Sequence, residues 1–284
     1  MRNKKGFIQI PFAWLFAIVV GALILFFAIY ASVKLIKTEE SVSSAETGKE
    51  IAVLLNPLET SFGEEKSTPL SIAVESRITN NCQVSGNFGE QEIVVTQKSR
   101  GEFARTGFGS TFYNKYIFSN KNVQGKNFYL FSKPFEFPFK VADLIFLTSA
   151  EEKYCFIDSP EEIQEELTNL NQGNLFVENC PSESTRVCFS PSSEEDCDIL
   201  VNKNQRTVNK NGKIVYFETD SLMFGAIFSD PLVYECQTKR LMKRLSELAF
   251  IYNDKQGVIS RVGCSAEVNL LALVASTSSY RDSA

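Results

Sequence analysis

Residues 10–33 read IPFAWLFAIVVGALILFFAIYASV, a run of 24 residues without a charged side chain. A helix of about 20 apolar residues crosses the hydrocarbon core of a bilayer. Because lipid offers the backbone no hydrogen-bond partners, a segment that spans it must be helical. We therefore expect a transmembrane helix at residues 10–33, followed by more than 200 residues of water-soluble domain.

The charges beside this run predict its orientation. Arg2, Lys4 and Lys5 precede it without an acidic residue, whereas the basic residues after it are offset by Glu39 and Glu40. Because positive residues stay inside, we expect a single-pass protein of the cell membrane, with residues 1–9 cytoplasmic and the C-terminal domain external. A cleaved signal peptide fits less well, since its apolar core has roughly 7–15 residues.

The first residues also carry a resemblance. Lys4-Lys5-Gly6, followed by Phe7 and an apolar helix, resembles the start of a type IV prepilin, which is cut after such a glycine. The resemblance covers roughly the first 35 residues and departs from the family at Pro11, where the fifth residue after the cut is normally Glu. It implies an alternative function, that of a pilin-like subunit processed after Gly6.

The cysteines indicate an oxidising compartment. An external location favours disulfides, and the spacing favours Cys188 with Cys197, closing a short loop, and Cys236 with Cys264, tying a helix to the segment after it. The other pairings stay open, and the odd cysteine is either free and buried or cross-links two chains. The seven cysteines are Cys82, Cys155, Cys180, Cys188, Cys197, Cys236 and Cys264.

Composition and motifs exclude several function classes. The chain has 29 Lys and Arg against 34 Asp and Glu; without the three basic residues before the run the counts are 26 and 34, a formal charge of −8. That balance argues against a nucleic-acid partner. The chain has no histidine and no C-x-x-C pair, so neither a His-based catalytic triad nor a structural zinc site is expected. No phosphate-binding glycine motif is present either, and we expect no cofactor.

Acidic residues are the remaining candidates for chemistry. The glutamates of the segment 161–166 recur four apart on a predicted helix, which is typical of a solvated face. The acidic loop 194–198 offers oxygen ligands for Ca²⁺ but lacks the spaced signature of a calcium loop. A histidine-free hydrolase using two carboxylates is a second alternative function, although nothing in the sequence selects a pair.

The rest of the chain divides by its patterns. Residues 34–60 are rich in helix formers and are expected to continue the membrane helix as a stalk. Residues 61–157 hold short β-branched and aromatic runs, some of them alternating, which predicts a strand-rich lobe. Residues 158–284 are expected to form a mixed α/β lobe braced by disulfides.

Three local signals stand out within that second lobe. Residues 159–162 (Ser-Pro-Glu-Glu) predict a capped helix reaching about residue 170. Asn211-Gly212 predicts a two-residue hairpin, and Asp230-Pro231 opens a helix reaching about residue 253, with a last short helix over 267–275. Residues 220–221, which precede the apolar run 222–228, are interpreted as caps and turns.

Together these features predict an α+β protein: a single N-terminal transmembrane helix, then a mixed, strand-rich extracytoplasmic domain with a few helices. The function expected of it is that of a membrane-anchored, non-enzymatic binding or assembly component of the cell envelope. Its expected partners are the lipid bilayer, through residues 10–33, and other envelope proteins.

Overall fold

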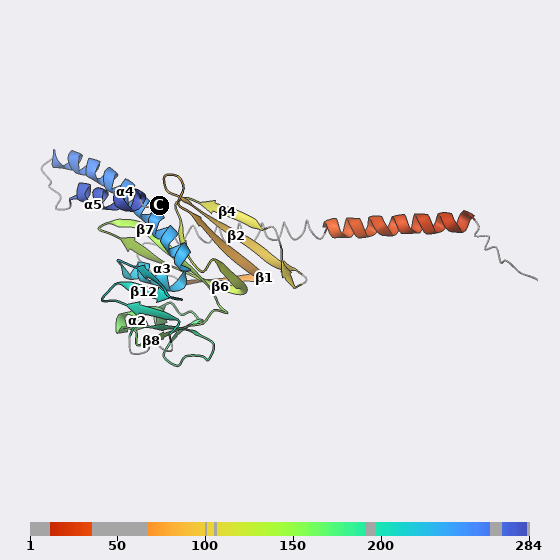
Figure 1. Ribbon diagram of the computed structural model, residues 1–284, viewed down its shortest axis with the longest axis horizontal. Helices are drawn as coiled ribbons and strands as arrows, with labels where there is room; N and C mark the ends of the chain where they lie inside the picture. Colours follow the sequence, from red (N-terminus) through yellow and green to blue (C-terminus); the bar gives the residue numbers. More distant parts are fainter. Residues whose placement is uncertain are drawn as a thin grey trace, which may run out of the picture. The chain divides into compact units, whose positions relative to one another are not determined.

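The computed structural model describes residues 12–35, 67–99, 101–104, 107–190, 197–261 and 269–282. The chain divides into two units, Met1–Ser43 and Ser44–Ala284. The first contains the helix Phe12–Leu35, which is long and apolar enough to cross a bilayer and has a mean hydropathy of 2.8 in its most apolar window. The second is a strand-rich domain with several helices (Figure 1). The predicted α+β class, with an apolar helix ahead of a strand-rich domain, is confirmed.

The first sheet uses the strands β1 to β7. Its order is β3-β2-β1-β6-β7-β5, with β4 paired to β2. All its pairings are antiparallel except that of β5 with β7. The strands are β1 (Ser67–Gln83), β2 (Glu90–Ser99), β3 (Glu102–Phe103), β4 (Phe108–Phe112), β5 (Tyr116–Phe118), β6 (Asn122–Glu136) and β7 (Lys140–Ser149).

The first sheet curls until its two sides meet. β2 and β5 are four strands apart, which would separate them by about 19 Å in a flat sheet. Yet the Ile117 N–H donates to Gln91 Oε1 at 3.0 Å, and Asn80 Nδ2 donates to the Ile117 carbonyl at 2.9 Å. Side-chain amides therefore bridge the seam of a nearly closed barrel. Its interior holds Leu70, Ile72, Ile78, Ile93, Val95, Ile117, Val123, Phe128, Leu130, Ile145 and Leu147.

The second sheet begins with β8, so the two sheets divide between Ser149 and Tyr154 rather than at the expected lobe boundary of 157/158. Its order is β13-β12-β11-β10-β8-β9. Its elements are β8 (Tyr154–Ile157), the helix α2 (Glu161–Asn169), β9 (Leu175–Val177), β10 (Thr185–Cys188), β11 (Ile199–Asn202), β12 (Thr207–Lys210) and β13 (Lys213–Tyr216).

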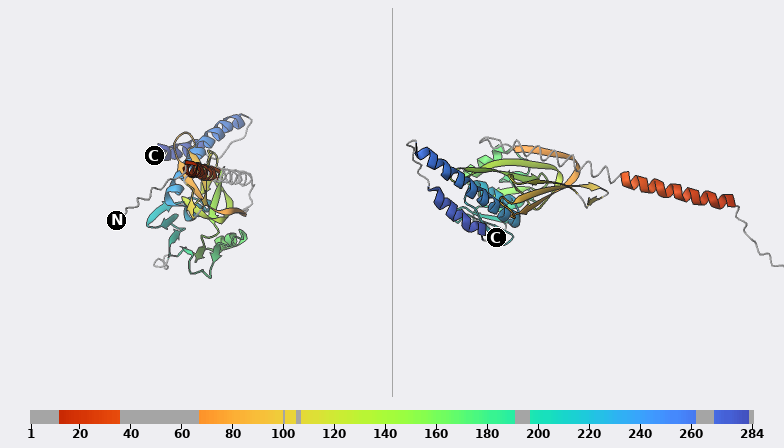
Figure 2. Two further views of the ribbon diagram at one scale, coloured as in Figure 1. Left: turned by 90° about the vertical axis from the view of Figure 1, so that its right-hand side faces the viewer. Right: turned by 90° about the horizontal axis from the view of Figure 1, so that it is seen from above.

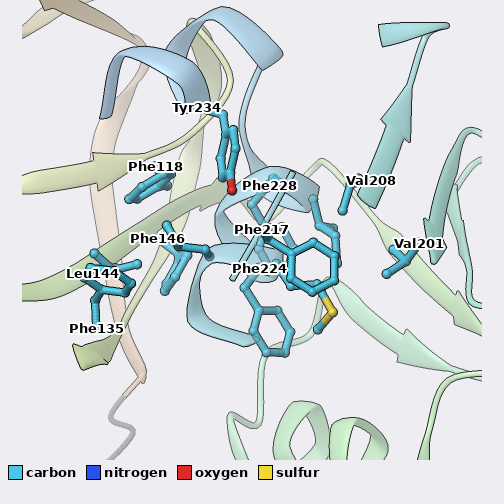
Figure 3. Close-up of a cluster of buried hydrophobic side chains, with 14 of the residues drawn as sticks. Phe118, Phe135, Leu144, Phe146, Val201, Val208, Phe217, Phe224, Phe228 and Tyr234 are labelled. Atoms are coloured by element: carbon cyan, nitrogen blue, oxygen red, sulfur yellow. The ribbon is translucent and has the colours of Figure 1, made fainter. Parts of the chain in front are cut away.

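The helix α3 (Asp220–Phe228) lies between the two sheets. It contacts β6 and β7 on one side and β12 on the other, and every residue from Ser221 to Phe228 is buried. Figure 3 shows Phe224 and Phe228 with side chains of both sheets around them. The sequence assigned no helix to residues 222–228, because a helix buried on all sides is apolar all round and shows no helical period.

Two further helices complete the domain. α4 (Pro231–Ser260) begins with the predicted Asp230-Pro231 signal and runs beyond the expected end near residue 253. α5 (Leu270–Asp282) packs along it, and the pair is seen side by side in Figures 1 and 2. The first half of α4 packs against the first sheet and α3, which secures the curled sheet to the core.

The local signals predicted from the sequence differ in how well they agree with the structure. The Asn211-Gly212 hairpin is confirmed, with φ angles of 54° and 77° that suit its turn. The serine cap of α2 is wrong, because the helix starts at Glu161 with Pro160 as its N-cap and no side-chain cap bond. Pro138 lies in the turn between β6 and β7.

Three disulfides join the cysteines of the described residues. They pair Cys188 with Cys197, as the spacing suggested, and also Cys155 with Cys180 and Cys82 with Cys236. The expected bond between Cys236 and Cys264 is therefore wrong: α4 packs on β1, which brings Cys236 to Cys82. Cys264 lies outside the described residues, as do Gly6, most of the predicted stalk and the acids 194–196.

Candidate functional site

A pocket of about 420 Å³ opens on the outer face of the second sheet. Side chains alternate along a strand, so Val201 and Val208 point to the core beside α3 while Leu200 and Asn209 face the other way. Ile214 of β13 is 57% exposed and belongs to the same outer wall. The sheet thus presents one face to the core and a hollow face to solvent.

Neutral amides dominate the polar lining of this pocket. Amide side chains both donate and accept hydrogen bonds, which suits an uncharged polar ligand. The Oδ1 atom of Asn209 is buried and has no hydrogen-bond partner among the described residues. The lining comprises Asn202, Asn204, Gln205 and Asn209, the hydroxyl of Thr207, the apolar Pro160, Phe189, Leu200, Val201 and Ile214, and the charged Asp158 and Lys203.

Polar contacts and a nearby disulfide hold several residues of the pocket wall in place. Lys203 Nζ lies 3.4 Å from the Asp220 carboxylate, and the Gln205 N–H donates to Asn202 Oδ1 at 2.9 Å. The disulfide between Cys188 and Cys197 joins the end of β10 to the residues before β11. The pocket is therefore held by a covalent bond and local polar contacts.

A second polar cluster lies inside the domain, where the two sheets and α3 meet. Lys210 is the last residue of β12 and, like Val208, points to the core side, where it is only 9% exposed. Its Nζ donates to Asn120 Oδ1 at 3.2 Å and to the carbonyls of Ile227 and Ser229 at 3.2 and 3.0 Å. Because Ile227 and Ser229 end α3, Lys210 also caps the negative end of that helix.

Glu152 and Tyr154 complete this cluster. Asn120 Nδ2 donates to Glu152 Oε2 at 3.4 Å, and the Tyr154 hydroxyl donates to the same oxygen at 3.3 Å. Burial raises the pKa of Glu152 above its ordinary value and lowers the pKa of Lys210, with the nearby Asp230 carboxylate opposing the second shift. Burial also raises the pKa of Tyr154. The surroundings thus favour the uncharged form of every titratable group in the cluster.

Arg240 of α4 occupies the seam of the curled sheet. Its guanidinium is fully buried and donates to the carbonyls of Lys115, Phe112 and Tyr113 at 3.0, 3.2 and 3.1 Å. It also donates to Gln237 Oε1 at 2.8 Å. Burial lowers its pKa to about 10. With these acceptors spread over backbone carbonyls, Arg240 is a structural cation that holds α4 to the sheet.

The acidic residues considered as candidates in the sequence do not form one site in the structure. Glu161, Glu162 and Glu165 are exposed on α2, and Glu166 forms an ion pair with Lys133 of β6. Asp198 accepts a hydrogen bond from the Arg186 N–H at 2.8 Å. Across the described ranges no three ligating side chains form a group that could hold a metal ion.

Sequence reasoning missed Asn120, Glu152 and Lys210, which stand 32 and 58 positions apart along the chain. One signal was present. Lys210 falls on the apolar side of the alternation that Val208 begins, and a lysine at such a position needs polar partners inside the fold.

Comparison with known proteins adds no relative, because no family model, no curated protein and no solved structure matches the chain. The function is therefore argued from the two sites above.

Proposed function

We propose that this protein is anchored in the cell membrane by its N-terminal helix and carries a binding domain on the external side. In this role residues 10–33 lie in the bilayer, residues 1–9 are cytoplasmic, and the domain acts without catalysis as a binding or assembly component of the cell envelope.

One observation carries the proposal: an exposed, strongly apolar helix precedes a domain with three disulfides. Phe16, Leu25 and Phe26 are 62–63% exposed, and no part of the helix window is buried against protein. Water disfavours such a surface and lipid favours it. Disulfides persist in oxidising compartments outside the cytosol, which supports an external domain.

The pocket on the second sheet supports a binding role. Its neutral amides match an uncharged polar group on an envelope partner, and the buried Asn209 Oδ1 accepts from a donor on that partner. Ile214 and Leu200 supply apolar area beside these polar groups, a combination common in binding sites.

A fractionation experiment tests location. The full chain is expressed, and we expect it in the membrane fraction, resistant to alkaline wash, with its domain digested by protease added outside intact spheroplasts. Thiol alkylation without reductant should spare the six bonded cysteines. A chain found in the aqueous fraction with reduced thiols would overturn the proposal.

The N-terminal peptide of the same sample separates this proposal from the pilin-like alternative. An intact Met1–Gly6 segment removes the pilin-like subunit, whereas a chain beginning at Phe7 supports it.

A capture experiment tests binding. A photo-reactive residue in place of Ile214 should cross-link a discrete envelope partner, and Asn209→Leu in the same chain should lower its yield about tenfold, since one lost hydrogen bond with a desolvated acceptor amounts to about 1–2 kcal/mol. The matched control is a photo-reactive residue at the exposed Lys126 of the first sheet, which should capture nothing specific. Equal capture from both positions would remove the pocket as the binding surface.

A further inference from the structure

We propose that Lys210 and Asn120 are joined by an intramolecular isopeptide bond, which the folded protein forms by itself when the amine of Lys210 displaces ammonia from the side-chain amide of Asn120, with Glu152 moving the proton. This modification site is independent of the ligand and the location proposed above, because it concerns only the interior of the domain.

The reacting groups are already in contact. Lys210 Nζ lies 3.2 Å from Asn120 Oδ1, and Glu152 Oε2 lies 3.4 Å from Asn120 Nδ2. A lysine amine, a carboxamide and a carboxyl group therefore stand in the order that an acyl transfer needs: nucleophile, electrophile, and an acid at the leaving nitrogen.

The loop that carries Asn120 is held on both sides. The Ser119 hydroxyl donates to the Asn120 carbonyl at 2.8 Å, and the Asn80 N–H donates to the Lys121 carbonyl at 2.8 Å. The Lys121 N–H donates in turn to Asp230 Oδ2 at 2.5 Å. These bonds fix the amide in front of the amine, which removes most of the entropy cost of bringing the two together.

The amine is also oriented. A neutral amine has two hydrogens, and the carbonyls of Ile227 and Ser229 accept two hydrogen bonds from Nζ. The third hydrogen of the ammonium faces Asn120 Oδ1, so the loss of that hydrogen leaves the lone pair of the amine on the side of Asn120. Burial lowers the pKa of Lys210 and raises that of Glu152, so transfer of a proton from the ammonium to the carboxylate gives the neutral pair that the reaction requires.

The step balances without any further reactant. Nζ of Lys210 forms a bond to Cγ of Asn120, and the bond from Cγ to Nδ2 breaks as the Glu152 carboxyl group protonates Nδ2. Nζ loses one hydrogen to the resulting Glu152 carboxylate, which regenerates the carboxyl group. One molecule of ammonia leaves, and nothing is oxidised or reduced. Lys210 is only 9% exposed and Tyr154 only 2%, which limits the access of water to the amine as a competing nucleophile.

Intact mass is the decisive measurement. The full-length protein is purified in detergent, reduced and alkylated. Its mass should be about 17 Da below the mass calculated from the sequence with every cysteine alkylated, a difference equal to one ammonia. After digestion with trypsin, the peptides that contain Asn120 and Lys210 should be found as one cross-linked species.

Three variants identify the chemistry. Glu152→Gln keeps the shape and should restore the full mass, because it cannot carry the proton. Asn120→Asp should give the same product mass as the wild type, since it reaches the same bond by losing water. Lys213→Met, at an exposed lysine of β13, is the matched control and should keep the deficit of about 17 Da.

A wild-type chain at its full sequence mass after reduction, with its three disulfides intact before reduction, would overturn the proposal. The disulfides report folding in the same spectra, because each lowers the unreduced mass by about 2 Da. A variant that fails to fold is thereby recognised, and the wild-type mass still decides the question. A negative result here leaves the membrane location untouched, and a failed fractionation test leaves this bond untouched.

Discussion

Individual buried basic side chains show how this sequence attaches one element to the next. Arg240 and Lys210 lie in the interior with backbone carbonyls and amides as their partners, in place of the carboxylates of a salt bridge. Each of the two donates to carbonyls at places where a strand or helix ends and its own ladder cannot supply a donor. Removing either one leaves those carbonyls buried without a donor.

Replacing Arg240 tests how much its hydrogen bonds to buried carbonyls contribute to stability. Arg240→Lys should lower the free energy of unfolding by about 2–4 kcal/mol, because an ammonium cannot reproduce the fork that reaches three carbonyls. Urea unfolding followed by circular dichroism in detergent measures it. Arg206→Lys, at an exposed ion pair with Glu218, is the control and should change the value by about 0.5 kcal/mol or less. Equal losses in the two variants would contradict a special role for Arg240.

The close packing of α3 against the first sheet can be tested at Gly225. An added Cβ at Gly225 would lie 2.8 and 2.9 Å from ring atoms of Phe118, so Gly225→Ala should destabilise the domain by about 1–3 kcal/mol through overpacking. Gly257 of α4 has nothing within 4 Å of the same position, so Gly257→Ala should stabilise the helix by up to about 1 kcal/mol. Thermal unfolding of both variants gives the comparison, and a stabilised Gly225→Ala would show that Phe118 moves aside freely.

At the scale of elements, the success of sequence reasoning depended on whether an element has two different faces. The hairpin of β12 and β13 was found because its turn residues and its alternation are both local. α3 was missed because both of its sides are apolar, and its role as the layer between two sheets is a property of tertiary packing alone. The curl of the first sheet could not be predicted for the same reason, since Gln91 and Ile117 meet only after five strands have paired.

The same difference between local and tertiary signals applies to the candidate sites. The outer-face amides lie close together in the sequence, between residues 202 and 209, but only the strand pairing shows that they line one pocket. The cluster of Asn120, Glu152 and Lys210 comes from two loops and one strand that are far apart in the sequence. No local pattern encodes such a meeting. Cys236 was assigned to the wrong partner because sequence proximity favoured Cys264 while packing favoured Cys82.

The disulfides join elements over very different spans, and their removal should reflect this. The paired cysteines are 154, 25 and 9 positions apart, for which the chain-entropy model gives about 5, 3.5 and 2.5 kcal/mol. Double replacement by alanine should therefore lower stability most for Cys82 with Cys236 and least for Cys188 with Cys197. Urea midpoints of the three variants give the order, and a reversed order would mean that strain or residual structure outweighs loop closure.

The molecule as a whole consists of two units with opposite preferences for solvent. The first unit exposes an apolar helix, and the second has buried hydrophobic cores. Exposed apolar residues in the second unit include Ile251 and Val258 of α4 and Leu271 of α5, each about 60% exposed or more. The proposed membrane anchor therefore belongs to the first unit.

Deleting residues 1–43 tests this division. The shortened chain should stay in the aqueous fraction, keep its three disulfides and unfold cooperatively, because both cores belong to the second unit. Fractionation and non-reducing mass spectrometry measure the outcome. If the shortened chain still sediments with membranes, Ile251, Val258 and Leu271 mark a second membrane contact.

The bond between Cys82 and Cys236 also determines how the domain carries a mechanical load. Tension applied at the start of β1 passes through residue 82 directly into α4, so the 154-position stretch between the two cysteines is bypassed. With the two disulfides inside it intact, that stretch would otherwise extend by about 400 Å when pulled straight. The barrel strands β2 to β7 and the whole second sheet lie inside the bypassed loop. Pulling on the two ends of the domain therefore cannot unravel them until this one covalent bond is reduced.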